Sequence, residues 1–385
     1  MPTLTLIMPT KNRQSTAMST ARSLAALASE DVEVVVQDAS ADARLGAWLI
    51  EQAWGGKVRY AHDATAVSMV ENWNRAIRRA TGDYICIIGD DDGVDARIVD
   101  LARWAARRGI SAVAFPHSAY VWKDFPSKHA GKAMIGRYTG AIEMLSPDTE
   151  LKRALRSPLD PIERLAQSYH GLVSSSLYRE LERRTGTVFD GLAPDYYTAV
   201  MLTALTDGAI AYVDYPVTMH GGSRASNSGR SRSGGLSEHI REFSQFELSD
   251  IMPADGRNHS LSILFVTQAM LLALQRLDRP DLLADFNLAT VYGAVLATRP
   301  IGVVPLVQKL IAASKKLGRS PYAELRALPR ATGRAAFVLA KSLIIHALPA
   351  AALEARGFRL LPARDIEEAL RHQAQILSDI TIALD

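Results

Sequence analysis

Three consecutive aspartates, Asp90, Asp91 and Asp92, are the residues whose spacing points most directly to chemistry. They follow the run 84–88, Tyr-Ile-Cys-Ile-Ile, which has the apolar character of a central strand covered on both faces. Neighbouring carboxylates repel one another unless a cation joins them, and a divalent ion with oxygen ligands is the usual partner. One aspartate could instead cap a helix that begins near Asp95. Three exceed that need, so we favour a metal site.

Polar residues also follow the first two strand-like runs. The run 4–8 is followed by Pro-Thr-Lys-Asn-Arg at 9–13, and the run 32–36 by Gln-Asp-Ala-Ser at 37–40. Asp38 is also the residue type of an Asx turn, which is common at strand ends. Binding is favoured for Asp38 because three adjacent strands would bring Asn12, Arg13, Asp38 and the aspartate cluster to one edge of a sheet.

Regular elements must position these residues. Strand-like runs occur at 4–8, 32–36, 58–60, 84–88 and 112–115. Helical stretches lie between them at 15–28, 42–54, 67–80 and 96–107. This alternation predicts βαβ units and a mostly parallel sheet, and therefore an α/β fold. Ligands of such sheets bind beyond the carboxyl ends of the strands, which is where the polar residues fall.

The motifs together resemble those of family 2 of the glycosyltransferases, which have the GT-A fold. The first strand ends in Pro-Thr-x-Asn-Arg and the second in Asp-x-Ser. Asn74 precedes an Ala…Gly-Asp-Tyr-Ile run and the acidic cluster, and Pro-Asp-Tyr-Tyr at 194–197 opens a helix. Each motif is weak alone, but four in this order over residues 3–228 are specific. The resemblance implies a GT-A central sheet flanked by helices, with a C-terminal helical extension.

The resemblance also implies a nucleotide-sugar donor, with a UDP-sugar favoured, and a divalent cofactor, Mn²⁺ or Mg²⁺. The metal ligands would be Asp91, Asp90 and His220. Gly89 stands where the family's motif has its first aspartate, which leaves the division of roles within the cluster open. The residues that would bind the nucleotide-sugar are Pro9, Thr10, Asn12, Arg13, Asp38, Asn74, Asp90 and Arg224.

Two of these donor-site roles are specific. Asp38 would accept a hydrogen bond from a uracil-like base, and Asn74 would help to close the pocket. For Asn74 an exposed position on a helix is an equal alternative.

Asp195 is the candidate general base. A sugar hydroxyl is a poor nucleophile until a carboxylate removes its proton, and a bound cation stabilises the charge that builds on a departing diphosphate. The two together would perform a single displacement that inverts the anomeric centre. An aspartate that only capped the helix 196–206 would look the same, so the catalytic role depends mostly on the resemblance.

A stretch rich in glycine and serine, 221–235, divides the chain into expected domains 1–235, of GT-A type, and 236–385, α-helical. The stretch holds three arginines and no acid, as linkers often do. His220 precedes it and is either a metal ligand or a structural residue. Arg224, Arg230 and Arg232 would contact the diphosphate, unless the stretch is a solvated linker.

Helical periodicity follows at 261–277, 282–296, 303–317, 335–355 and 366–384. Residues 299–364 carry 12 Lys or Arg and two acids, a local net charge of +10. These basic helices would either contact an anionic membrane face or form the surface of a packed bundle, and the two are compatible. Apolar residues within 366–384 indicate pairing with another subunit, and therefore a homo-oligomer.

The composition and the motifs argue against several classes of protein. A single cysteine, Cys86, leaves no internal disulfide and fits a reducing compartment. With no signal peptide or spanning run in view, we expect a cytoplasmic protein at the inner face of the membrane. The turn 9–13 is not the glycine-rich turn of a dinucleotide-dependent oxidoreductase. The basic region lacks the aromatic residues that accompany nucleic-acid binding, so no nucleic-acid partner is expected.

The expected activity is therefore a glycosyltransferase of hexosyltransferase type. It would transfer a sugar to the hydroxyl of a glycan or glycolipid acceptor, in cell-surface polysaccharide or glycolipid assembly. The alternative is a non-catalytic nucleotide-sugar-binding scaffold of the same fold.

Overall fold

A central sheet of eight strands organises the N-terminal half. The computed structural model describes residues 3–52, 54, 57–65, 67–226, 262–298 and 302–384. The strand order is β3-β2-β1-β4-β10-β6-β11-β9, with β10 and β9 antiparallel to their neighbours. The predicted α/β fold with a mostly parallel sheet is confirmed. The strands are β1 Leu4–Thr10, β2 Val32–Asp38, β3 Val58–His62, β4 Tyr84–Ile87, β6 Ala112–Ala114, β9 Ile142–Leu145, β10 Leu172–Ser174 and β11 Ile210–Val213.

Both faces of this sheet are covered by helices. Alternate residues of β4 belong to two apolar clusters: Ile85 and Ile87 face one, and Tyr84 and Cys86 face the other. This explains why the run is apolar throughout. The first cluster includes α3, α5, α6 and α7, and the second includes α1, α2 and α4. These helices are α1 Gln14–Ala25, α2 Arg44–Glu51, α3 Met69–Ile77, α4 Arg97–Arg108, α5 Pro147–Arg156, α6 Ser175–Thr185 and α7 Pro194–Leu205.

A second sheet of five strands lies beside the aspartate cluster. Its order is β13-β8-β7-β12-β5. The two-residue strand β5 begins directly after Asp92, and its partner β12 carries His220. The strands are β5 Gly93–Val94, β7 His117–Val121, β8 Lys132–Ile135, β12 Thr218–Gly222 and β13 Arg359–Pro362. This sheet therefore joins the turn that follows β4 to a strand more than a hundred residues later.

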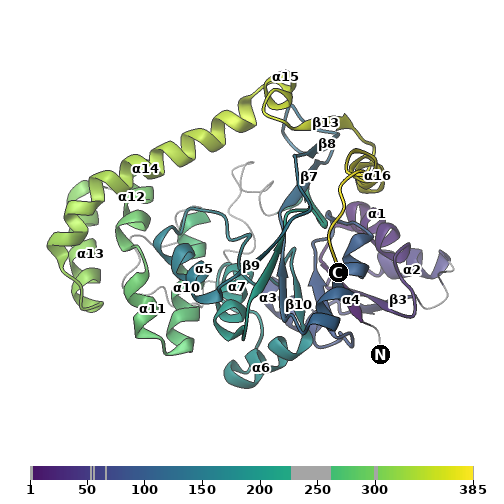
Figure 1. The fold of residues 1–385 in the computed structure, drawn as a ribbon, viewed down its shortest axis with the longest axis horizontal. Coiled ribbons are helices and arrows are strands. Elements are labelled where there is room, and N and C mark those ends of the chain that lie inside the picture. The colour runs from purple at the N-terminus through teal and green to yellow at the C-terminus, as the bar shows by residue number, and fades with distance from the viewer. Residues whose placement is uncertain are drawn as a thin grey trace.

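The C-terminal half supplies a group of helices, of which α10 packs against α7 and α12 packs against α13 and α14. Gly293 of α12 lets the helix approach α14 closely, since a Cβ there would lie 2.7 Å from the backbone nitrogen of Thr332. Figure 1 shows α14 running from α12 and α13 to α15, which lies near β13. The helices are α10 Ser262–Leu277, α11 Pro280–Asp285, α12 Leu288–Thr298, α13 Val303–Lys316, α14 Pro321–Ala347 and α15 Ala350–Glu354.

Two predicted helices differ from the structure. The helix expected at 335–355 belongs to two elements, because Pro349 precedes α15 and cannot continue the hydrogen bonding of α14. The helix expected at 282–296 is likewise divided between α11 and α12. The domain boundary expected at 235/236 falls outside the described residues and stays a proposal. Among the described helices, none is both long and apolar enough to cross a membrane.

The end of the chain packs back onto the N-terminal half. β13 pairs with β8 in antiparallel register, and α16 (Ile366–Ile376) contacts α1, β5 and β8 (Figure 1). Ile366 is fully buried in the same apolar cluster as α1 and α4. The apolar side of α16 is therefore covered by its own chain, rather than being free for the subunit contact expected from the sequence. Residues 359–376 therefore pack against the N-terminal half.

Replacement of Ile366 tests this arrangement. Ile366→Ala should lower the free energy of unfolding by about 3 kcal/mol, because it removes buried methyl groups and leaves a cavity between α16 and the N-terminal core. The measurement is urea unfolding of the full chain. The matched control is Ile50→Ala on α2, where the side chain is 83% exposed and a change below about 0.5 kcal/mol is expected. Equal effects at the two positions would contradict the packing of α16.

Candidate active site

The three aspartates lie in a turn between β4 and β5 whose backbone is held by neighbouring side chains. The hydroxyl of Thr20 in α1 donates to the carbonyl oxygens of Asp92 at 2.9 Å and Asp90 at 3.2 Å. Trp122 Nε1 donates to the carbonyl oxygen of Asp91 at 2.9 Å. All three aspartates are buried. The turn is therefore fixed by the protein itself.

Asp90 contacts the turn that follows β1. Thr10 Oγ1 donates to Asp90 Oδ2 at 2.6 Å, and Arg13 donates to Asp90 Oδ1 at 3.0 Å. Burial raises the pKa of Asp90, and the Arg13 charge opposes that shift. The predicted meeting of Thr10, Arg13 and Asp90 at one sheet edge is thus found, with Asp90 joined to an arginine and a hydroxyl.

Asp91 contacts the segment that follows β12. Ser223 Oγ donates to Asp91 Oδ2 at 2.5 Å. Burial, together with the charges of Asp92 and Asp90, raises the pKa of Asp91 well above its usual range. Gly221 packs directly on the same turn, since a Cβ there would lie 1.8 Å from the Asp91 carbonyl oxygen. Only glycine fits at position 221 unless the turn moves.

Asp92 is the aspartate with the most partners. Its Oδ2 accepts from Tyr169 OH and from the Gly89 amide, each at 2.6 Å, and its Oδ1 accepts from the Gly221 amide at 2.6 Å. His170 Nε2 lies 3.0 Å from Oδ2. Burial alone would raise the pKa of Asp92, but His170 and its other partners hold it below the usual value.

Asp92, His170 and His220 form a group that could hold a metal ion, with one ligand atom each within 4.8 Å of the others. His220 Nδ1 lies 3.4 Å from His170 Nε2 and 3.6 Å from Asp92 Oδ1. Ligand atoms about 2.1 Å from one ion lie about 3.0 Å apart at right angles and about 3.4 Å apart in tetrahedral geometry. His170 lies nearest one oxygen of Asp92 and His220 nearest the other, so the three side chains are close enough together to be candidate ligands of one divalent ion.

His170 is held in place by its backbone and by β12. Its Nδ1 lies 2.9 Å from Thr218 Oγ1, which leaves Nε2 facing Asp92. A hydrogen bond of this kind orients a histidine that binds metal through its other nitrogen. His170 also has a φ of 56°, in the left-handed region that few non-glycine residues adopt. It precedes β10, whose antiparallel direction brings its beginning to the carboxyl end of β4.

Asp195 lies near this group, in the first turn of α7. It is within electrostatic range of His170 and of Tyr169, the residue that donates to Asp92. Burial raises the pKa of Asp195, and the backbone amides of Asp195 and Tyr196 partly oppose that shift. The helix begins at Pro194 and its N-cap, Ala193, makes no side-chain cap hydrogen bond. The arrangement brings the candidate base and the aspartate cluster into one neighbourhood.

The family model described as glycosyl transferase family 2 matches residues 5–156. These residues belong to glycosyl transferase family 2. The matched segment contains the 9–13 turn, Asp38, Asn74 and the aspartate cluster, whereas Asp195 lies beyond it. The family resemblance, the GT-A fold and the enzyme class predicted from the sequence, a glycosyltransferase, are confirmed.

Solved structures with a similar chain path include S. aureus TarS and a mannosyltransferase from Pyrobaculum calidifontis. S. aureus TarS 1–349 in complex with UDP-GlcNAc is 12% identical, with a TM-score of 0.47, over 83% of this chain and 93% of that chain. The mannosyltransferase PcManGT from Pyrobaculum calidifontis, in complex with GDP-Man and Mn²⁺, is 18% identical, with a TM-score of 0.39, over 87% and 86%. Neither likeness is close enough to carry a functional conclusion. No curated protein gives a significant match.

Within the glycosyl transferase family 2 segment, Asp38 is fully buried and has protein partners on both oxygens. The backbone amide of Ser40 donates to Oδ1 at 2.8 Å, and Tyr60 OH donates to Oδ2 at 2.9 Å. The Asx turn considered from the sequence is therefore present. Asn12 has a φ of 58° and accepts from the Ala41 amide at 3.0 Å, which ties the first strand end to the second.

Asn74 departs from both sequence interpretations. It is buried, and its amide makes three hydrogen bonds to the backbone of Val188 and Phe189, at 2.9 to 3.1 Å. It therefore anchors the segment before α7, and a role in closing the nucleotide pocket is not what these bonds indicate. Asn72, two residues earlier, donates to the Thr10 carbonyl at 3.2 Å and lies nearer the strand ends.

The arginines of the glycine-rich stretch lie partly outside the structure. Arg224 is exposed, and its backbone amide contacts Asp124 Oδ1 at 3.4 Å. Arg230 and Arg232 fall outside the described residues. Pro9 lies within β1 beside Gln37 of β2.

Of the metal ligands expected from the sequence, Asp91, Asp90 and His220, the last belongs to the group described above. Asp90 and Asp91 direct their oxygens to Thr10, Arg13 and Ser223. Asp92 and His170 complete the candidate group. Asp90 and Asp91 as metal ligands stay a prediction.

Metal titration of two variants separates these assignments. His220→Ala should raise the dissociation constant for Mn²⁺ at least about tenfold, because an imidazole ligand is lost, while the half-exposed position leaves folding intact. The measurement is calorimetry with MnCl₂. The control is His372→Ala, an exposed histidine on α16. Unchanged affinity in His220→Ala would remove His220 from both ligand sets. A loss of affinity in Asp91→Asn would support Asp91, which only the set expected from the sequence contains.

Proposed function

We propose that the chain is an inverting glycosyltransferase that moves a sugar from a nucleotide-diphosphate donor, with UDP favoured, to an acceptor hydroxyl on a glycan or glycolipid. The observation that carries this proposal is the Asp92, His170 and His220 group at the carboxyl edge of a glycosyl transferase family 2 sheet, with Asp195 within electrostatic range of His170 and of Tyr169. A base and a metal-binding group in one neighbourhood are the two parts that a single displacement needs.

The donor side is formed by the first strand end and the aspartate turn. Arg13 and Thr10 fix Asp90, so the ends of β1 and β4 are held together where a ribose and diphosphate would lie. Asp92, His170 and His220 would hold the divalent ion, which supplies stabilisation of the charge that develops on the leaving diphosphate. Two imidazole nitrogens are poor ligands for Mg²⁺, which prefers oxygen, so Mn²⁺ fits this set better than Mg²⁺.

The acceptor side is formed by the start of α7. A carboxylate whose pKa is raised by burial holds a proton more tightly than an exposed aspartate, and so is a stronger base when it is ionised. Asp195 would accept the proton of the acceptor hydroxyl as the new glycosidic bond forms. The Tyr169 hydroxyl donates to Asp92 at 2.6 Å, and Tyr169 is within electrostatic range of Asp195.

Replacement of the base tests the reaction. Asp195→Asn should lower kcat by about 10²–10⁴-fold, the usual contribution of a general base, and should leave the affinity for UDP unchanged. The measurements are UDP release in the presence of Mn²⁺ and calorimetry with UDP. Transfer at the native rate in Asp195→Asn would remove Asp195 from the mechanism. Absence of transfer by the native chain, with UDP still bound, would favour the non-catalytic scaffold instead.

Asp195 should also determine how the transferase activity falls at acidic pH. The pKa of Asp195 is raised in the folded protein, so the carboxylate takes up a proton at a higher pH than an ordinary aspartate does. Activity should therefore fall as the pH decreases through that raised pKa, above the usual value of about 3.9. This acidic limb should be absent from the residual activity of Asp195→Asn.

We also propose that the basic C-terminal helices contact an anionic membrane surface, where a glycolipid acceptor would be found. Val303 and Val304 at the start of α13, and Tyr322 and Phe337 on α14, are between 58% and 75% exposed. They lie in the segment 299–364 with its local net charge of +10. Exposed apolar side chains among basic ones are the combination that binds membrane interfaces, with each cation adding about 1 kcal/mol.

Vesicle flotation tests the membrane contact. The full chain should float with vesicles of phosphatidylglycerol and phosphatidylcholine, and much less with phosphatidylcholine alone, because the attraction is electrostatic. Tyr322→Ser with Phe337→Ser should reduce flotation, whereas Ile50→Ser, an equally exposed site on α2, should not. Equal flotation of all variants, or with neutral vesicles, would contradict the contact.

A further inference from the structure

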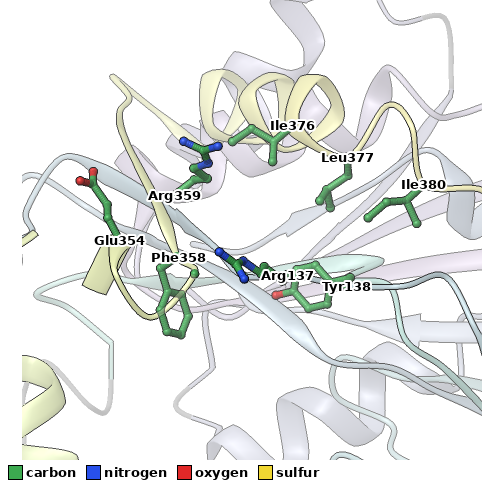
Figure 2. Close-up of a pocket in the computed structure, with 10 residues that line it drawn as sticks. Arg137, Tyr138, Glu354, Phe358, Arg359, Ile376, Leu377 and Ile380 are labelled. Carbon is green, nitrogen blue, oxygen red and sulfur yellow. The ribbon is translucent and has the colours of Figure 1, made fainter. Parts of the chain in front are cut away.

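A cavity of about 590 Å³ lies away from the aspartate cluster, between the edge of the second sheet and the end of the chain. Its volume is within the range of small-molecule sites in proteins. Arg137, beyond the end of β8, and Arg359, at the start of β13, line it. Ile376, Leu377 and Ile380 line it as well, and Arg359 lies beside Ile376 in Figure 2. The lining thus combines cationic and apolar side chains.

The two arginines lack partners within the described residues. Most of the described arginines make an ion pair or a hydrogen bond through the side chain, but the exposed side chains of Arg137 and Arg359 make none with any described residue. The exposed side chain of Glu354, which also lines the cavity, likewise has none within the described residues. Two guanidinium groups and one carboxylate leave the lining with a net positive charge. Two guanidinium groups that face a common cavity with a single carboxylate favour the binding of an anion.

The backbone is shaped to admit one of these arginines. Gly357 has a φ of 94°, and a Cβ built there would lie 2.7 Å from Arg137 Nε. The glycine therefore provides both the turn before β13 and the space that the Arg137 side chain occupies. Arg359 pairs with Ile135 across the two strands, so Arg137 and Arg359 emerge from the same end of the β8–β13 ladder.

The apolar lining comes from residues that are distant in sequence. Leu377 is buried at the end of α16, and Ile376 and Ile380 are partly buried beside it. Phe358 and Tyr138 complete the lining on the strand side (Figure 2), and Tyr138 OH donates to the His117 carbonyl oxygen at 3.1 Å. A small hydrophilic anion would use the arginines only and leave this apolar surface uncovered.

We propose that the cavity binds a phosphorylated amphiphile, with its phosphate on Arg137 and Arg359 and its hydrocarbon part against Ile376, Leu377 and Ile380. Arginine is suited to this task because its planar donors match phosphate oxygens. The site is separate from the proposed donor and acceptor sites, and it does not depend on the proposed transferase activity. The bound molecule is either a lipid headgroup with its chain or a soluble alkyl phosphate.

Calorimetry on the full chain, without donor or metal, tests the site. The probe is dodecyl phosphate below its micelle-forming concentration. Arg137→Gln with Arg359→Gln should weaken its binding at least about tenfold, because charge-assisted hydrogen bonds are lost. Glu354→Gln should strengthen it, since a like charge is removed from the cavity edge. Arg107→Gln, an exposed arginine on α4 outside the cavity, should leave it unchanged.

Two further ligands separate the contribution of the phosphate charge from that of the hydrocarbon chain. Dodecyl maltoside has the same chain without the charge, and inorganic phosphate has the charge without the chain, so both should bind at least about tenfold more weakly than dodecyl phosphate. Equal binding of dodecyl maltoside, or an unaltered affinity in the double arginine variant, would overturn the cationic site. Equal binding of inorganic phosphate would overturn the role of the apolar side. Vesicles containing phosphatidic acid that compete with dodecyl phosphate would identify a lipid as the source.

Discussion

The burial of three adjacent carboxylates after β4 is the constraint on which the rest of the site depends. An unpaired charge in a protein interior costs several kcal/mol, so three neighbouring aspartates can be buried only if each finds its own partners. Asp90 is joined to Arg13, Asp91 to Ser223, and Asp92 to Tyr169 and His170. These partners come from separate parts of the chain. The electrostatic demand of one turn therefore fixes how distant segments are arranged.

The second sheet meets part of that demand through its backbone. β5 follows the aspartate turn directly, and its pairing with β12 brings Gly221 against the Asp91 carbonyl. The Gly221 amide is then in position to donate to Asp92. Because the same strand carries His220, one strand pairing positions a backbone donor and a candidate metal ligand together. Because Gly221 packs directly against the Asp91 carbonyl, no side chain fits at residue 221 in this pairing.

The sequence allowed the sheet and part of the site to be predicted, because polar residues after apolar runs mark the carboxyl ends of parallel strands. Arg13, Asp38 and the aspartate turn follow that rule. His170 does not, since it precedes its strand, and only the antiparallel direction of β10 brings it to the same edge. Asn74 matched the family pattern, but its buried contacts with Val188 and Phe189 depend on packing that spacing cannot express. A motif fixes residue types more reliably than it fixes their partners.

The return of the chain to the N-terminal half was the least predictable feature, since periodicity alone cannot show what a helix packs against. Gln373 of α16 is fully buried and donates to Asp95 Oδ2 at 3.2 Å and to the Pro216 carbonyl at 2.8 Å. Asp95 follows β5, and Pro216 precedes β12, so a single side chain braces the strand that follows the aspartate turn and the strand that pairs with it. α16 ends at the cavity lined by Ile376 and Leu377. The C-terminal helix α16 therefore contacts both the strands beside the aspartate turn and the cavity. The geometry of the aspartate turn thus depends on residues nearly three hundred positions later in the chain.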